Sequence, residues 1–344
     1  MPTTLLKPNS AGCPRIAFVG AVEGSLTAFN ALVAAGMAPV LLVTLPPEVS
    51  HRHSDFADLG LPARAAGTAV HLTTDINAPA TIAALAEAAP DLTLVVGWSQ
   101  ICRRAFRSVA PLGTLGFHPA PLPRYRGRAV IPWTILSGEA TTGSTFFWLD
   151  DGVDSGPIVM QQLFPIDPDE TARSLYDRHV MALAEMTPRV VARIAAGNAG
   201  GTPQDEARAS YCAKRTMEDG VIDWGEPADA ILRLVRAVGD PYPGAFTFAG
   251  DTRIVVEAAR SHRPKGRHIG FAGQVQTYTS TGFTVLCGDG ETVEITRWQP
   301  SDGRRPRIHA RLNCASSGED SMRRSSVYQR TKCSTPSATL VAGR

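Results

Sequence analysis

Residues 115–133, LGFHPAPLPRYRGRAVIPW, contain one histidine, four prolines and three arginines. This composition disfavours a helix or a central strand, because proline lacks the backbone N–H that both structures need. It favours a rigid loop that presents side chains to a pocket. A second loop-like segment, residues 149–158, reads LDDGVDSGPI, with two glycines flanking Asp154. We therefore expect the two segments to form the walls of an active site, with His118 on one wall and Asp154 on the other.

Upstream of these loops, short apolar runs alternate with helix-like stretches. The runs are typical of buried parallel strands, and they cover residues 15–20, 40–44, 69–72 and 92–97. The alternation predicts an α/β fold with a doubly wound sheet. Ligands of such sheets bind outside the carboxyl ends of the strands, where we expect residues 98–101 and the His118 loop to lie.

One long helix is predicted after residues 167–170, DPDE. Aspartate suits the N-cap, proline the first helical position and glutamate the third position after the cap. Pro188 is then expected to break or kink this helix before residue 197.

The C-terminal part of the chain has a different pattern. Short β-type runs joined by Gly and Asp turns extend over residues 244–298 and predict a small β-barrel-like domain. A polar, glycine-rich linker separates this part from the first domain. The expected domains are residues 15–200 and 209–300. Residues 303–344 are rich in Arg, Ser and Thr and are predicted to form a disordered tail, because they bury too little apolar surface to offset the entropy of ordering.

The composition of the whole chain excludes several classes of protein. Its 344 residues suit two domains, and the formal net charge of +2 gives no bulk basic field. The six cysteines form no CxxC pair, so neither a zinc site nor a disulfide framework is expected. No apolar run is long enough to span a bilayer. We expect a soluble, cytoplasmic protein without a metal.

His118 and Asp154 are the candidate chemical pair. Histidine is the side chain best suited to moving protons near neutral pH. A neighbouring carboxylate fixes the tautomer of an imidazole and raises its basicity. Asp150 and Asp151 are alternative partners that spacing alone does not exclude.

Together with residues 219–224 (DGVIDW) and 241–246 (PYPGAF), the two loops resemble the folate-dependent formyltransferase family. The resemblance covers roughly residues 15–300, and the family includes methionyl-tRNA formyltransferase and amino-sugar N-formyltransferases. It implies a catalytic domain of Rossmann-like topology in which 10-formyltetrahydrofolate donates a formyl group to a primary amine. His118 and Asp154 match the histidine and the aspartate of the family motif.

Gly116 stands where the family motif, Asn-x-His, has asparagine. The resemblance implies that this asparagine hydrogen-bonds the oxyanion of the reaction, and losing one such donor typically costs about 2.7–4 kcal/mol. Three explanations stay open. A water or backbone N–H replaces the asparagine, His118 stabilises the oxyanion as a cation, or the enzyme is impaired. We favour a natural variant of the motif, with Gly116 at a catalytic position.

The resemblance also places the folate pterin against the loops at residues 97–101 and 149–154, where exposed backbone groups can read its amide edge. The residues expected to bind the donor there are Gly97, Trp98, Ser99, Gln100, Ile101, Asp150, Asp151, Gly152 and Val153. Arg124 and Arg126, with Arg128, are expected either to clamp a phosphate or the folate glutamate or to be surface arginines of a solvated loop. The loop at residues 51–55 is expected to border the acceptor site.

The expected acceptor is an amino sugar linked to a nucleotide. Residues 242–246 resemble the sugar-modifying branch more than the tRNA branch, and the modest net charge agrees, since a tRNA enzyme should present a basic stripe. Methionyl-tRNA is the alternative acceptor, and a catalytically impaired folate-binding or regulatory protein is a further alternative. A nicotinamide dehydrogenase is disfavoured because the chain lacks its glycine fingerprint. A homodimer is a candidate assembly.

Overall fold

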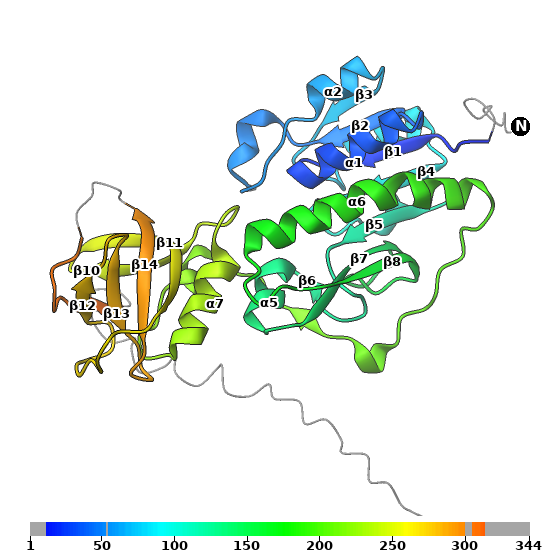
Figure 1. The fold of residues 1–344 in the computed structure, drawn as a ribbon. Coiled ribbons are helices and arrows are strands. Elements are labelled where there is room, and N and C mark those ends of the chain that lie inside the picture. Colours follow the sequence, from blue (N-terminus) through cyan, green and yellow to red (C-terminus); the bar gives the residue numbers. More distant parts are fainter. Residues whose placement is uncertain (1–11, 53, 300–304, 314–344) are drawn as a thin grey trace, which may run out of the picture.

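The computed structural model describes residues 12–52, 54–299 and 305–313, which form two lobes (Figure 1). The larger lobe is built on a seven-stranded sheet with the order β3-β2-β1-β4-β5-β7-β8. The strands from β3 to β5 are parallel, whereas β7 and β8 are antiparallel to their neighbours. Their bounds are β1 Ile16–Val19, β2 Leu41–Thr44, β3 Ala69–Leu72, β4 Leu92–Val95, β5 Thr114–His118, β7 Thr141–Trp148 and β8 Ile158–Pro165. The predicted α/β class and doubly wound sheet are confirmed.

Helices cover both faces of this sheet, which explains why every residue of β1, β2 and β4 is buried. The helices α1 and α6 pack side by side over one face (Figure 1). The opposite face packs against α3 and Phe106 of α4. The helices of this lobe are α1 Glu23–Ala34, α2 Gly60–Ala65, α3 Pro79–Ala88, α4 Arg104–Arg107, α5 Val130–Leu136 and α6 Ala172–Ala195, with a 3-10 helix at Pro47–Arg52.

The smaller lobe is an antiparallel six-stranded sheet with the order β12-β13-β14-β11-β10-β15. The helix α7, Ala228–Val238, packs against it. The strand bounds are β10 Ala245–Ala249, β11 Thr252–His262, β12 Val275–Tyr278, β13 Phe283–Leu286, β14 Thr292–Gln299 and β15 Leu312–Asn313. The predicted β-rich C-terminal domain is therefore confirmed in its architecture.

The structure differs from the predicted disordered tail at residues 305–313. The strand β15 lies within this range and pairs antiparallel with β10. Leu312 is 2% exposed in the core of the smaller lobe. This single apolar side chain and its backbone pairing are too short to give a periodic sequence signal. The remainder of the predicted tail, residues 314–344, lies outside the described residues.

The helix α6 begins four residues later than predicted. Its N-cap is Thr171, whose hydroxyl accepts a hydrogen bond from the backbone N–H of Ser174 at 3.1 Å. The expected start at residues 167–170 was wrong, and the helix does not break at Pro188. The helix passes through Pro188 because the turns around it are held in the core of the lobe by buried apolar side chains, which outweigh one lost hydrogen bond. These are Met186, Val190, Val191 and Ile194.

The two lobes share one apolar core. Ile131 and Ile135 of α5 and Leu175 of α6 belong to the same buried cluster as Ile231 and Val235 of α7. The smaller lobe is therefore fixed against the larger one by packing, which is a condition for a site built from both.

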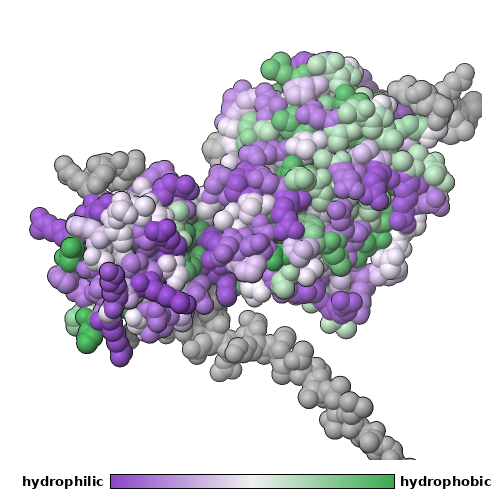
Figure 2. All heavy atoms as spheres, viewed as in Figure 1, coloured by the Kyte–Doolittle hydropathy of each residue, from purple (hydrophilic) through white to green (hydrophobic). Residues whose placement is uncertain are grey.

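On the face shown in Figure 2, hydrophobic residues gather over the larger lobe and hydrophilic residues cover most of the smaller one.

His179 of α6 is an ionisable group within the packed interior. It is 3% exposed, its Nδ1 lies 2.9 Å from the Oγ of Ser144 on β7, and its ring meets Phe164 edge-on. Burial, together with smaller contributions from the positive charges of His118 and Arg178, lowers the pKa of His179 to about 3. The imidazole is therefore neutral over the whole range in which the protein is expected to work.

We predict that His179→Leu flattens the pH dependence of stability between about pH 6.5 and pH 3. In this window the unfolded chain binds a proton at His179 that the folded chain does not, so wild-type stability falls as pH falls. The slope from this group is about 1.4 kcal/mol per pH unit. Urea unfolding at several pH values measures it. Thr187→Val, on the same helix, changes a buried polar side chain without a titratable group and should keep the wild-type slope. Equal slopes in wild type and His179→Leu would contradict the prediction.

Candidate active site

A cavity of about 930 Å³ lies between the two lobes at the carboxyl ends of β4 and β5. Such a volume is typical of a small-molecule site. Both predicted loops line it, and the smaller lobe contributes Tyr242, Pro243 and Gly244. The predicted site residues in its lining are Gly97, Trp98, Ser99, Gln100, Ile101, Gly116, His118, Asp150, Gly152, Val153 and Asp154. Ser54 and Asp55, from the loop expected to border the acceptor site, are also in the lining.

His118 is the last residue of β5, and its ring is 7% exposed. Its Nε2 lies 2.7 Å from the carbonyl oxygen of Tyr125. A carbonyl only accepts hydrogen bonds, so Nε2 carries the proton in the neutral ring and Nδ1 presents its lone pair. Nδ1 lies 3.7 Å from Oδ2 of Asp154. The arrangement leaves one basic nitrogen next to a carboxylate, as a proton acceptor in a buried site requires.

Asp154 is held in an unusual backbone conformation. Its φ of 52° lies in the left-handed region, which aspartate tolerates better than most residues. Its Oδ2 accepts a hydrogen bond from the backbone N–H of Gly127 at 2.7 Å. The His118 loop and the Asp154 loop are thus joined directly, as expected for two walls of one site.

Gly116 lies on β5, next to the side chain of Leu149. A Cβ at position 116 would lie 2.5 Å from Cδ2 of Leu149, so the leucine side chain occupies the space of any larger residue there. Leu149 also lines the cavity. Sequence reasoning did not find this contact, because the two residues are 33 positions apart and only the pairing of β5 with β7 brings them together.

Two of the arginines predicted to bind the donor do not line the cavity. Arg124 forms an ion pair with Glu139. Arg126 is 0% exposed, and its guanidinium is paired with Glu206. A fully dehydrated guanidinium that is already paired cannot clamp a ligand, so the expectation for Arg126 is corrected. Arg128 does lie in the lining.

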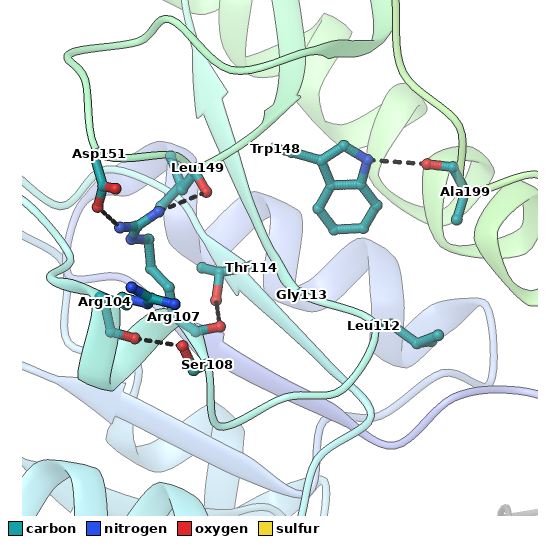
Figure 3. Close-up of a pocket in the computed structure, with 10 residues that line it drawn as sticks. All are labelled: Arg104, Arg107, Ser108, Leu112, Gly113, Thr114, Trp148, Leu149, Asp151 and Ala199. Atoms are coloured by element: carbon teal, nitrogen blue, oxygen red, sulfur yellow. Dashed lines mark hydrogen bonds and ion pairs between the residues drawn. The ribbon is translucent and has the colours of Figure 1, made fainter.

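Asp151 is not in the lining of this cavity, and its prediction as a donor-binding residue is corrected as well. It lines a second pocket, of about 700 Å³, where it pairs with Arg107 (Figure 3). Arg107 also donates to the carbonyl of Leu149 at 3.2 Å. These contacts hold the start of the 149–156 loop. Asp150 accepts from the backbone N–H of Gly152 at 3.0 Å and stabilises the turn from within.

The cysteines of the cavity lining are unsuited to nucleophilic catalysis. Burial raises the pKa of Cys102 to about 12. Burial also raises the pKa of Cys212 to about 11, with a further contribution from the negative charge of Asp154. Both thiols are therefore protonated near neutral pH, and the thiolate is the reactive form. Neither cysteine is therefore suited to form a covalent enzyme intermediate.

Several lining residues were missed at the sequence level. Tyr176 of α6 donates its hydroxyl hydrogen to Oδ2 of Asp55 at 2.6 Å and accepts from the N–H of Gly24 at 3.3 Å. Lys214 and Arg215, in the segment between the lobes, lie at the cavity beside Arg128. These contacts join segments that are distant in the chain, and no motif spans them.

Among residues 12–52, 54–299 and 305–313, no helix combines the length and the apolar character needed to cross a bilayer. The same residues contain no group of three or more His, Cys, Asp or Glu placed to hold a metal ion.

Comparisons with known proteins agree with this geometry. The formyl transferase model matches residues 40–191, and the model of the formyl transferase C-terminal domain matches residues 214–315. Methionyl-tRNA formyltransferase of Halorhodospira halophila is 37% identical over 84% of this chain and 93% of that protein. The protein of the same name from Chloroflexus aurantiacus is 36% identical over 85% of this chain and 94% of its own length.

The solved structures show the same fold at lower identity. An N-formyltransferase from Helicobacter canadensis, in complex with folinic acid and dTDP-3-aminofucose, has a TM-score of 0.59 at 15% identity over 82% of this chain and 98% of its own. HypX from Aquifex aeolicus, in complex with tetrahydrofolic acid, has a TM-score of 0.60 at 19% identity over 83% of this chain. This chain covers only 44% of HypX.

The expectation of an amino-sugar acceptor was wrong. Relatives that are 32–37% identical over most of the chain are methionyl-tRNA formyltransferases. The sugar N-formyltransferases resemble the chain at only 15–18% identity, which shows a shared fold and nothing about the acceptor. The sequence argument relied on a short motif and on net charge, and a basic site can be hidden within a neutral total.

The two family matches, the relatives at more than 30% identity and the paired His118 and Asp154 loops lead to one conclusion: the chain is an enzyme of the folate-dependent formyltransferase family.

Proposed function

We propose that this chain transfers the formyl group of 10-formyltetrahydrofolate to the α-amine of methionyl-tRNA. The observation that carries the proposal is the identity of 32–37% to methionyl-tRNA formyltransferases over most of both chains. The smaller lobe supports it, since the match to the curated relatives extends through both lobes. Residues 15–200 would form the catalytic unit and residues 209–300 a second unit that completes the acceptor side.

The charges at the cavity also favour a nucleic-acid acceptor. Arg128, Lys214 and Arg215 all lie in its lining. Within the described part of the chain, no carboxylate forms an ion pair with any of the three. Arg215 instead stacks over the ring of Trp133, 4.9 Å from its centroid. Unpaired cations beside an aromatic ring suit the phosphates and bases of an unpaired tRNA end.

The donor would lie against the 97–101 and 149–153 segments, which supply apolar contacts and backbone groups. Gln100 braces the first segment, because its side chain bonds to the backbone of Thr74 and Ile76 at 2.9 Å each. The second segment is braced by Arg107, as described above. Two braced walls of loop backbone fit a flat ring that carries an amide edge. When bound, 10-formyltetrahydrofolate supplies the electrophilic formyl carbon.

His118 and Asp154 would handle the proton of the attacking amine. Tyr125 fixes the neutral tautomer with the proton on Nε2. Nδ1 can then accept a proton from the amine as the new C–N bond forms. The resulting imidazolium faces the carboxylate of Asp154, which stabilises it. The imidazolium can return this proton to N10 of the folate as the bond between N10 and the formyl carbon breaks, which releases tetrahydrofolate. Asp154 would therefore act on the charge of His118.

The proposed reaction places the enzyme in the cytoplasm, where aminoacylated tRNA is made. The homodimer expected from the sequence stays a prediction, which light scattering of the free protein tests.

The deciding experiment measures release of tetrahydrofolate with methionyl-tRNA and, in parallel, with nucleotide-linked amino sugars. We expect turnover with methionyl-tRNA only. Its KM should rise steeply with salt, because binding the tRNA phosphates releases counterions. Turnover of an amino sugar without turnover of the tRNA would overturn the proposal. Folate binding without turnover of either acceptor would support the catalytically impaired protein.

We predict that His118→Ala lowers kcat with methionyl-tRNA by about 10²- to 10⁴-fold, the usual contribution of a general base. Binding of 5-formyltetrahydrofolate, measured by calorimetry, should be retained because the loops that form the donor walls are unchanged. His262→Ala, in the smaller lobe and away from the cavity, is the matched control and should keep wild-type kcat. Wild-type kcat in His118→Ala would contradict the proposed role.

We predict that Gly116→Asn alone has little benefit, whereas Gly116→Asn combined with Leu149→Ala raises kcat. The single substitution places its Cβ against Leu149, so the new side chain is displaced from the cavity. Removing the leucine branch frees that space for an amide that can donate to the developing oxyanion, a contact worth about 2.7–4 kcal/mol where it is well placed. Leu149→Ala alone is the control. A double variant no faster than this control would show that another group already stabilises the oxyanion.

A further inference from the structure

Arg126 is a buried charge that the proposed chemistry does not use. Its side chain is 0% exposed. Its Nη1 and Nη2 bind the two carboxylate oxygens of Glu206 at 2.9 and 2.7 Å, and Nη1 also donates to the hydroxyl of Tyr211 at 2.8 Å. Nε and Nη2 donate to Oε1 of Gln204 at 3.1 and 2.9 Å. All five N–H groups of the guanidinium are thus satisfied.

Gln204 connects this charge to the active-site loop. Its oxygen accepts both hydrogen bonds from Arg126, which fixes the orientation of the amide. Its Nε2 must then point the other way, where it donates to the carbonyl of Asp154 at 2.8 Å and to that of Gly156 at 2.7 Å. The side chain therefore spans the distance from the buried guanidinium to the backbone of the loop.

Residues 126 and 127 hold both the carboxylate and the backbone carbonyl of Asp154. Gly127, the residue after Arg126, donates its backbone N–H to the carboxylate of Asp154. Arg126 reaches the carbonyl of Asp154 through Gln204. A left-handed φ of 52° at a residue other than glycine persists only where the surroundings determine it. These two contacts determine it, and they set the carboxylate opposite Nδ1 of His118.

We propose that Arg126 and Gln204 are positioning residues that hold Asp154 in place against His118. The inference rests on the catalytic role proposed for this pair. Neither residue lines the cavity, so their effect is on the geometry of Asp154 and not on substrate binding. A shift of about 1 Å in a catalytic group can cost about 100-fold in rate, which gives such support a measurable consequence.

The test compares two isosteric substitutions at two of the three partners of Arg126. Gln204→Glu keeps an acceptor for Arg126 but replaces the N–H donors with an oxygen that repels the carbonyls of Asp154 and Gly156. Glu206→Gln also changes a partner of Arg126, and it keeps an acceptor, yet it touches neither carbonyl. Folding of both variants is checked by circular dichroism and thermal melting.

We predict that Gln204→Glu lowers kcat with methionyl-tRNA by about 10- to 100-fold with little change in either KM. Glu206→Gln should lose thermal stability but keep its kcat. A merely structural role predicts that both variants lose thermal stability and that both keep their kcat once folded. The inference is overturned if folded Gln204→Glu keeps wild-type kcat, or if Glu206→Gln loses as much kcat.

A second measurement is independent of turnover. Hydrogen exchange of the backbone amides in residues 152–156 should become faster in Gln204→Glu than in Glu206→Gln, since only the first substitution releases the loop. Equal exchange in the two variants would overturn the inference. If the wild type formylated no acceptor at all, the proposed function would fail, while the exchange comparison would still decide whether Arg126 and Gln204 hold the Asp154 loop.

Discussion

The complete burial of one guanidinium constrains most of the active site. Arg126 cannot lose its charge near neutral pH, so burial requires that all its N–H groups find partners. These partners, Gln204, Glu206 and Tyr211, all come from the segment after α6. That segment is therefore drawn against the proline-rich loop, where β6 Arg126–Gly127 pairs with β9 Tyr211–Cys212. The loop that carries Asp154 is hydrogen-bonded to both, through Gly127 and Gln204.

The antiparallel direction of β7 also affects where Asp154 lies relative to His118. Because β7 runs antiparallel to β5, His118 at the end of β5 pairs with Thr145 in the middle of β7, and the end of β7 lies beside Leu115 near the start of β5. The 149–156 loop must return along the sheet to bring Asp154 to His118, and on the way it forms a wall of the cavity. Arg107 fastens the beginning of this path and Gln204 its end. A long loop thus gains the rigidity that a proton-transfer site requires.

The sequence was informative where the signal was local. The apolar runs predicted the parallel strands, and the His118 and Asp154 loops lie at one cavity as expected. It failed where an outcome depended on contacts between distant residues. Arginine is a residue type that often binds phosphate, but Arg126 is buried by partners that lie about 80 positions later in the chain. Tertiary packing of α6 overrode both a good N-cap and an internal proline. Acceptor identity was mispredicted in part because the net charge does not show that Arg128, Lys214 and Arg215 gather at one cavity.

The apolar core shared by α5, α6 and α7 has a consequence for how such enzymes diversify. A chain severed between the lobes would leave Ile131, Ile135 and Leu175 without the partners that bury them. The two lobes are therefore not interchangeable modules, because a C-terminal lobe from another protein would not match the side chains of this shared core. Individual substitutions around the cavity, such as at Arg128, Lys214 and Arg215, would change the acceptor site without disturbing the core, to which these residues do not belong. Because the lobes are packed together, we expect such enzymes to diversify by substitutions around the cavity and not by exchange of a whole lobe.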